Sequence, residues 1–173
     1  MEFNKRTAYI YVKTNPGQLN KVFEQFRKHE FVIGAWAVTG DYDCIAWVNA
    51  KNDDDIYNWA NTMKNWEGID YTTSHFVHNG YIQNFDQLHS PAGVWLRLRT
   101  NKMDVMPAIF KDHPYVASWA NVPGEYDFVC YLTGENLQKA LENVVHLTEN
   151  HNWKTYTHVP VYTYLNDNYR NKL

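Results

Sequence analysis

The chain has 173 residues, a length that fits one ordinary domain or two small ones. Its 16 Lys and Arg residues against 19 Asp and Glu residues give a formal net charge of −3, which excludes sequence-independent nucleic-acid binding through a strongly basic surface. Aromatic residues make up 16% of the chain and charged residues only 20%, so ordinary disorder is excluded because enough apolar surface is available for a folded core.

In chain order, the first half predicts strand, helix, strand, strand, helix and strand. β-branched and aromatic runs mark the strands, and apolar residues with a spacing of three and four mark the helices. The run Asp53–Asp55 is expected to supply the N-cap and an acidic first turn of the second helix. The predicted elements are strand 8–13, helix 19–26, strands 31–38 and 43–48, helix 53–63 and strand 70–77.

The second half predicts the same order of elements. One position resists, because Pro107 falls inside the first helical pattern of this half. That helix therefore either begins late, with Pro107 in its first turn, or is kinked there. The predicted elements are strand 93–99, a helix near 104–111, strands 116–122 and 127–132, helix 136–150 and strand 154–159.

The two halves repeat one another. The stretch Val38–Asp43 reappears as Val122–Asp127, and the first strands of the halves match with a slightly different offset. The order βαββαβ is that of a ferredoxin-like unit, in which both helices cover one face of an antiparallel sheet. We therefore predict an α+β protein with two tandem ferredoxin-like domains, at residues 1–80 and 92–173, joined by a linker at 81–91.

Strand alternation separates two faces in each predicted sheet. Aliphatic and thiol side chains form the face expected under the helices, whereas rings and charges form the other face. We expect the two bare faces to pack against each other, as in an intramolecular dimeric α/β barrel, with Asp43 and Asp127 as partners for the arginines. Two interpretations are open: a filled structural interface, or a pocket for a planar or anionic ligand. The predicted inter-sheet residues are Tyr9, Tyr11, Trp47, Trp95, Arg97, Arg99 and Tyr131.

The repeated loop carries a family resemblance. A Val-x-Gly-Asp/Glu-Tyr-Asp stretch between two strands of a βαββαβ unit resembles the effector-binding (RAM) domain of the Lrp/AsnC transcription regulators. The first half matches it nearly end to end, through Ala8–Thr14, Pro16–Gly17 and Thr72–Ser74. The second half matches through Val122–Asp127 and more loosely elsewhere, so the resemblance covers about 150 residues.

The resemblance implies a small effector, usually an amino acid, bound at a subunit interface near this loop. The glycine allows close backbone approach, Asp41 or Asp43 suits an ammonium group, and Tyr42 can cover an aliphatic side chain. The simpler alternative is a tight turn whose aspartates accept local N–H groups. The ligand-binding residues implied are Gly40, Asp41, Tyr42, Asp43, Gly124, Glu125, Tyr126 and Asp127.

The resemblance also implies partners. Relatives of this kind dimerise and assemble further, so a homo-oligomer is expected. The regulators carry an N-terminal helix-turn-helix domain, whereas here the first strand is predicted to begin by about residue 7. We therefore expect a stand-alone sensing and oligomerisation protein that acts on transcription through DNA-binding Lrp/AsnC relatives, without direct contact to nucleic acid.

An enzyme or haem protein is the alternative, because related α/β-barrel folds include haem enzymes and sirohaem decarboxylases. A tetrapyrrole would use the inter-sheet rings and arginines together with one axial histidine, such as His75. His75 and His158 are expected on opposite faces, which argues against a symmetric ligand pair, and His29 and His113 are expected at helix ends. No nucleophile triad, phosphate loop or zinc motif occurs, so no catalytic residue, cofactor or metal is expected.

Two further classes are disfavoured by the sequence. Single-stranded RNA could stack on strand aromatics, but the net charge and the lack of an RNP-like run oppose this interpretation. No apolar run reaches the roughly 18 residues of a membrane helix, and no secretory signal is visible. Cys44 and Cys130 lie in apolar strand-like runs and are expected to be buried, reduced thiols of a cytoplasmic protein.

Overall fold

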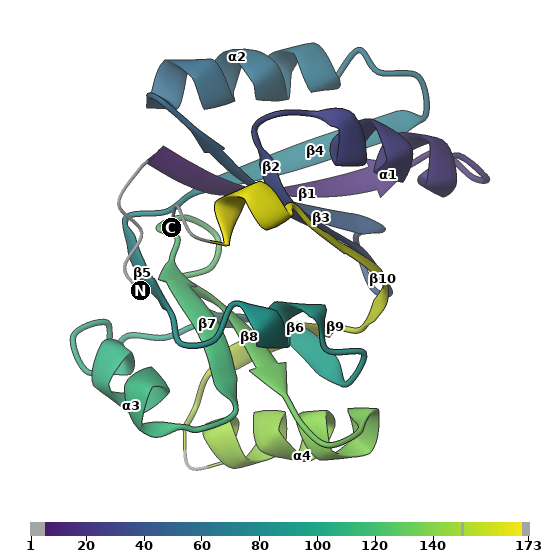
Figure 1. Cartoon of the computed structure of the whole chain (residues 1–173). Helices are drawn as coiled ribbons and strands as arrows, with labels where there is room; N and C mark the ends of the chain where they lie inside the picture. The colour runs from purple at the N-terminus through teal and green to yellow at the C-terminus, as the bar shows by residue number, and fades with distance from the viewer. Residues whose placement is uncertain (1–5, 150, 171–173) are drawn as a thin grey trace. The chain divides into compact units, whose positions relative to one another are not determined.

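The computed structural model describes residues 6–149 and 151–170. These residues form two compact units, and each unit has a five-stranded antiparallel sheet and two α-helices (Figure 1). The first unit contains residues 6–77 and 160–170, and the second contains residues 78–159. The predicted α+β class with two tandem ferredoxin-like units is confirmed.

In the first unit, the strand order is β10-β2-β3-β1-β4. The central strand pair β1 and β3 is antiparallel, with Tyr9 opposite Trp47. The elements of this unit are β1 (Arg6–Thr14), α1 (Leu19–Lys28), β2 (Val32–Val38), β3 (Cys44–Ala50), α2 (Asp53–Met63), β4 (Ile69–Phe76), β10 (Pro160–Leu165) and the short 3-10 helix η2 (Asp167–Tyr169).

In the second unit, the strand order is β5-β7-β8-β6-β9. Here β6 and β8 form the central pair, with Trp95 opposite Tyr131. The elements are β5 (Asn79–Ile82), the 3-10 helix η1 (Asp86–His89), β6 (Gly93–Arg99), α3 (Met106–Asp112), β7 (Val116–Asn121), β8 (Phe128–Thr133), α4 (Leu137–Thr148) and β9 (Lys154–His158).

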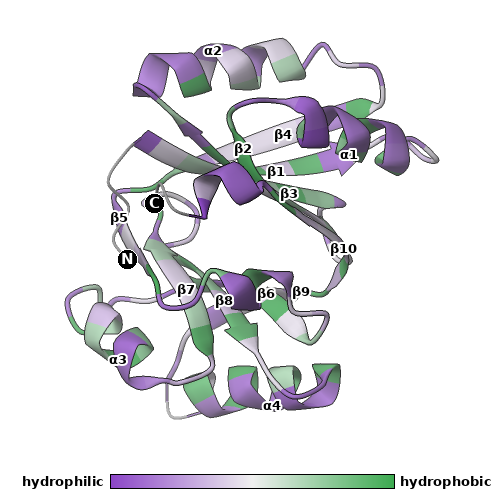
Figure 2. Cartoon of the chain, in the orientation of Figure 1, coloured by the Kyte–Doolittle hydropathy of each residue, from purple (hydrophilic) through white to green (hydrophobic). Residues whose placement is uncertain are grey.

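Both helices of each unit cover the same face of its sheet (Figure 1). The aliphatic and thiol side chains that strand alternation assigns to this face form the core beneath the helices, as predicted. In the first unit, Ile10 and Cys44 pack with Phe26 and Ile56; in the second, Cys130 holds the matching place. Figure 2 shows that hydrophilic and hydrophobic residues are interspersed along α1 and α2, as expected for helices packed on one side.

The helix starts follow local chemistry. Asn52, rather than the predicted Asp53–Asp55 run, caps α2, because its side chain accepts the N–H of Asp55, and the three aspartates occupy the first turn. Asn136 caps α4 in the same way. Pro107 lies in the first turn of α3, so the late start is correct and no kink is needed.

The predicted domain boundaries differ from those of the structure. The segment 81–91 is not a plain linker, since β5 pairs with β7 and η1 follows it. The last strand, β10, leaves the second half and pairs with β2 of the first unit. Each unit therefore has a fifth strand that the four-stranded prediction lacks, placed at the sheet edge next to β2 or β7. Close docking of β10 needs Gly34, because a Cβ there would lie 2.6 Å from Leu165 Cδ2.

Both cysteines are free and buried, as predicted. Burial raises the pKa of the Cys44 thiol to about 12, and Asp43 adds to this effect; burial alone raises the pKa of Cys130. None of the helices in the described part of the chain has the length and apolar composition needed to cross a bilayer.

Candidate functional site

The loop between β2 and β3 contains the first set of predicted ligand-binding residues. Gly40 has φ +124°, a backbone region that residues with a Cβ avoid, so the turn itself requires glycine. Gly40 and Asp41 are exposed, whereas Tyr42 is buried. The loop is closed by the N–H of Val38, which donates to the carbonyl of Asp43 at 2.8 Å.

Asp43 is the anchor of this loop. Its carboxylate accepts the N–H of Thr14 at 2.8 Å, the Thr14 hydroxyl at 3.0 Å and the Lys13 ammonium at 3.0 Å. Burial raises the pKa of Asp43, but these three donors together outweigh burial, and the net effect is a lowered pKa. The turn interpretation therefore accounts for Asp43, and among the two aspartates of this loop the exposed Asp41 is the one accessible to a ligand.

Tyr42 belongs to an aromatic cluster on the helix-free face. Its hydroxyl lies 3.0 Å from the hydroxyl of Thr73 on β4, and its ring centroid lies 5.3 Å from Tyr11 and 5.7 Å from Tyr71. A buried tyrosine with its hydroxyl bonded is fixed in place. The ring can form one wall of a ligand site next to the loop, and this role stays a prediction.

The second loop, between β7 and β8, repeats the geometry of the first. The N–H of Val122 donates to the carbonyl of Asp127 at 2.8 Å, and the Asp127 carboxylate accepts the N–H of Thr100 at 2.7 Å. Gly124 and Glu125 are exposed and Tyr126 is buried, as at the equivalent positions of the first loop. The two loops therefore have the same local structure. In each, the aspartate carboxylate accepts a backbone N–H at the end of the central strand.

The helix-free faces carry equivalent rows of side chains. In the first unit, Tyr9 pairs with His75 on one side and with Trp47 on the other. In the second, Trp95 pairs in the same way with His158 and with Tyr131. All six side chains are buried, the most exposed being His75 at 5%.

The prediction that His75 and His158 lie on opposite faces is therefore wrong. Strand pairing places both beside equivalent residues of the central strands, Tyr9 and Trp95. The error is one of register, because a bulge between Lys13 and Thr14 shifts the pairing of β1 with β4 by one residue. An alignment of the two halves that matches His75 with His158 gives the correct register of β4 and β9.

Arg97 is the one fully buried arginine among the described residues, with 1% exposure. Its Nε–H donates to His158 Nε2 at 3.0 Å, and its guanidinium lies 4.4 Å from the ring centroid of Tyr126 and 5.5 Å from that of Tyr156. Sequence reasoning expected a carboxylate partner and missed this histidine and this pair of rings. Because the bond requires His158 Nε2 without a proton, it also fixes the tautomer of that ring.

The remaining predicted inter-sheet residues lie as follows. Tyr11 is buried and stacks edge-on against His75 at 5.3 Å. Tyr131 is buried and donates its hydroxyl to the carbonyl of Ser90 at 3.0 Å, and burial raises the pKa of that hydroxyl. Arg99, at the end of β6, is exposed. Whether a pocket separates the sheets stays a prediction.

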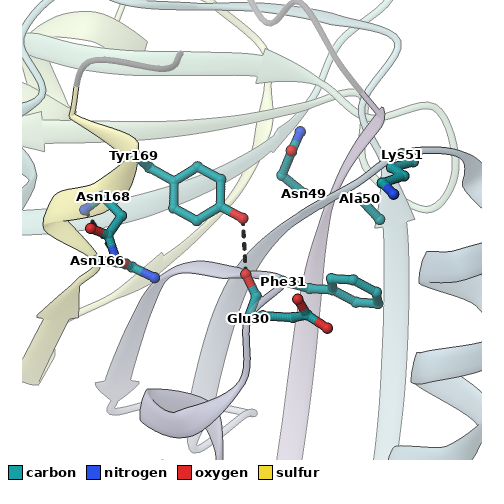
Figure 3. A pocket seen from close by; sticks show the side chains of 8 residues that line it. All are labelled: Glu30, Phe31, Asn49, Ala50, Lys51, Asn166, Asn168 and Tyr169. Atoms are coloured by element: carbon teal, nitrogen blue, oxygen red, sulfur yellow. Dashed lines mark hydrogen bonds between the residues drawn. The ribbon is translucent and has the colours of Figure 1, made fainter.

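A cavity of about 590 Å³ in the first unit was not predicted from the sequence. The C-terminal segment forms one wall, and the hydroxyl of Tyr169 donates to the carbonyl of Glu30 at 2.9 Å (Figure 3). Glu30 and Lys51 bring one charge of each sign to it. No sequence pattern indicated this cavity, because the C-terminal segment reaches it only through the pairing of β10 with β2.

The described residues contain no group of three or more His, Cys, Asp or Glu side chains placed to hold a metal ion. His29 and His113 are the C-cap residues of α1 and α3, as predicted. Burial lowers the pKa of His29 and outweighs the opposing effect of Glu30.

Residues 7–86 match the family model of the Lrp/AsnC ligand binding domain. The recognition of an Lrp/AsnC-type ligand-binding domain, made from the repeated loop, is therefore confirmed for residues 7–86. The match supports a small-molecule-sensing domain as the coarse function of this unit.

Two curated relatives are HTH-type transcriptional regulators FL11, from Pyrococcus furiosus and Pyrococcus horikoshii. Each is 26% identical over 70 residues, which is 40% of this chain. The chain spans about half the length of these relatives, because 46% of each is covered.

Among solved structures, the siroheme decarboxylase NirDL shares the fold. The similarity covers 91% of this chain and 71% of that chain, with a TM-score of 0.67 and 7% identity. The same enzyme in complex with an iron-uroporphyrin III analogue gives a TM-score of 0.68 and 8% identity. At this identity the comparison shows the fold alone.

Proposed function

We propose that the protein senses an amino acid through its loops Gly40–Asp43 and Gly124–Asp127. The observation that carries the proposal is the match of residues 7–86 to a ligand binding domain whose loop is repeated, with the same anchoring, in the second unit. The exposed carboxylates Asp41 and Glu125 receive the ammonium group of the ligand. The backbone around Gly40 approaches its carboxylate.

Thermal-shift measurements with each of the twenty amino acids, followed by calorimetric titration of those that stabilise the protein, test this proposal. A ligand at 100 times its Kd raises stability by about 2.7 kcal/mol, so a true effector is easily seen. The variant Asp41→Asn removes the proposed ammonium partner and weakens binding, whereas Asp70→Asn, an exposed aspartate on β4, leaves it unchanged. A flat response to all twenty amino acids would exclude this ligand class.

We propose further that the protein self-associates and acts on transcription through DNA-binding relatives. The support is that its curated relatives are HTH-type regulators, to which it is similar over 70 residues. Light scattering coupled to gel filtration, with and without the effector, measures self-association. Co-purification with a DNA-binding Lrp/AsnC relative from the same cell tests the second step, and a monomer that captures no such relative contradicts both.

A tetrapyrrole is the second candidate ligand. It is favoured by the placement of His75 beside Tyr9 in the first unit and the equivalent placement of His158 beside Trp95 in the second, where His158 accepts a bond from the buried Arg97. The fold is shared with siroheme decarboxylase. Binding of iron by His158 through Nε2 requires the bond from Arg97 to break, because that nitrogen cannot serve both. His75 is therefore the better candidate for an axial ligand.

Addition of haem or sirohaem tests this candidate through the Soret band. Binding through His75 predicts a shifted band in the native protein that is lost in His75→Ala and kept in His158→Ala. If no band shift appears, the tetrapyrrole candidate falls while the amino-acid proposal stands.

A further inference from the structure

A hollow of about 670 Å³ lies in the second unit where β6 ends and β9 begins. We call it the basic hollow, because three cationic side chains line it: Arg99, Lys102 and Lys154. Asp127 is the one acidic side chain in its lining. The volume falls within the range of sites that hold small molecules.

The cations of the basic hollow have no carboxylate partner among the described residues. No ion pair in this part of the chain includes Arg99, Lys102 or Lys154. Asp127 forms no ion pair with any of the three in the described part of the chain, and its carboxylate accepts the backbone N–H of Thr100. Its single negative charge against three positive charges leaves the lining positive. Three like charges that converge on one hollow in a chain of net charge −3 create a local positive potential, which attracts anions.

The equivalent place in the first unit is built differently. There Lys13 occupies the position of Arg99, and its ammonium is bound to Asp43 at 3.0 Å. Strand pairing places Tyr71 opposite Lys13, where Lys154 stands opposite Arg99 in the second unit. The aspartate that anchors the loop is therefore present in both units, whereas cations without an ion pair line the equivalent place only in the second. The fold itself does not require the basic hollow.

Two aromatic side chains contribute to the lining of the basic hollow. The rings of His151 and Trp153 stack with their centroids 4.1 Å apart and their planes 12° apart, and both line the hollow. The guanidinium of Arg99 can bind a phosphate or carboxylate through two parallel hydrogen bonds. The ammonium groups of Lys102 and Lys154 act as point charges.

We propose that the basic hollow binds a small molecule that carries two or more negatively charged oxygen atoms, as a phosphate ester or a polycarboxylate. Arg99 and Lys154 hold the anion, and Lys102 adds charge from the loop after β6. This site adjoins the loop Gly124–Asp127 through Asp127, which is in its lining, but it does not rest on the amino-acid proposal.

Titration of the whole protein with pyrophosphate and, separately, with citrate tests this inference by amide NMR at about 150 mM salt, where weak surface attraction is screened. We expect saturable shifts at the amides of Thr100, Asn101 and Lys154. The variants Arg99→Gln and Lys154→Gln each weaken binding about tenfold, since each removes one charge-assisted contact. Preference for pyrophosphate or citrate identifies which oxyanion the site takes.

Lys111→Gln is the matched control, because it removes one exposed cation from the same unit outside the basic hollow. It leaves both affinities unchanged. Lys102 lies in a loop, so Lys102→Gln is a second variant that leaves the strands unchanged. We expect it to weaken binding as well. Absence of saturable binding of either anion, or equal affinity in the Arg99 and Lys111 variants, overturns the inference.

Discussion

Arg97 and His158 form a buried side-chain pair in which the arginine Nε–H donates to His158 Nε2 at 3.0 Å. The bond joins the central strand β6 to the edge strand β9, and the Tyr126 ring lies over the guanidinium at 4.4 Å. It therefore links the second loop, through Tyr126, to the helix-free face of the second sheet. A buried guanidinium that donates its Nε–H and lies against a ring face depends on arginine rather than on charge alone.

Arg97→Lys keeps the charge but loses the Nε–H bond to His158 and the flat contact with Tyr126. We expect a loss of about 1–3 kcal/mol in the free energy of unfolding, measured by urea denaturation. Arg99→Lys, on the same strand but exposed, is the control and changes stability by less than about 0.5 kcal/mol. Equal effects of the two variants would show that the buried contacts of Arg97 contribute little.

The helix caps give a second prediction, in which the equivalent caps of the two units are compared with each other. Asn52 and Asn136 each accept an N–H three residues ahead, at 2.8 Å and 2.9 Å. Asn52→Ala and Asn136→Ala should therefore each cost about 1 kcal/mol of unfolding free energy. Asn58→Ala, in the exposed interior of α2, should be neutral or slightly stabilising because alanine has the higher helix propensity.

Much of this fold follows from sequence periodicity. Strand alternation assigned Ile10 and Cys44 to the helix-covered face correctly, because burial on one side imposes a period of two. The capping residue Asn52 was missed because the three aspartates after it also suit a helix start, and only the geometry separates cap from first turn. β5 and β10 were missed because both lie outside the repeated βαββαβ order, and they pair at the edges of the two sheets.

For the candidate site, the sequence predicted where the loops lie but not the contacts that hold them. The repeat located both loops, since an identical pattern at matched positions implies an identical local structure. It did not reveal that Asp43 and Asp127 fasten their loops to Thr14 and Thr100, because the partners lie on another strand. It also misplaced His158 by one residue, and in a strand one residue is the difference between two faces.

Asp43 makes stability depend on pH in a defined direction. Its folded-state pKa is lowered, so its contribution is present above the unfolded value of about 3.9 and is lost as pH falls through the folded value. Asp43→Asn should lower the unfolding free energy at pH 7 by about 1–2 kcal/mol, with a difference from the natural protein that shrinks below pH 4. Urea denaturation at pH 7, 5 and 3.5 measures this.

The exposed Asp70 provides the control for Asp43. Asp70→Asn should leave the unfolding free energy unchanged within about 0.5 kcal/mol at each pH. A constant difference between Asp43→Asn and the natural protein from pH 7 to 3.5 would contradict the assignment of the effect to carboxylate ionisation.

The two buried thiols should be inert in the folded protein. With a pKa of about 12, only about one Cys44 side chain in 10⁴ is ionised at pH 8, and the thiolate is the reactive form. We expect no rapid reaction with a disulfide reagent at pH 8 under native conditions and two equivalents of reaction in guanidinium. Rapid native reaction of either cysteine would show that its strand opens frequently.

The docking of β10 onto β2 depends on Gly34, and this gives the last prediction. A Cβ at position 34 would lie 2.6 Å from both Leu165 Cδ2 and the Trp36 ring, so Gly34→Ala must change the spacing to both of them. Because Leu165 is on the edge strand, we expect β10 to yield, with a loss of about 1–3 kcal/mol and faster hydrogen exchange at the amides that join β10 to β2. Val161→Ala, which trims an exposed side chain of β10, should leave that exchange unchanged. If Gly34→Ala instead keeps β10 protected and loosens β1 or β3, the strain falls on Trp36 and the edge strand is held more firmly than its position suggests.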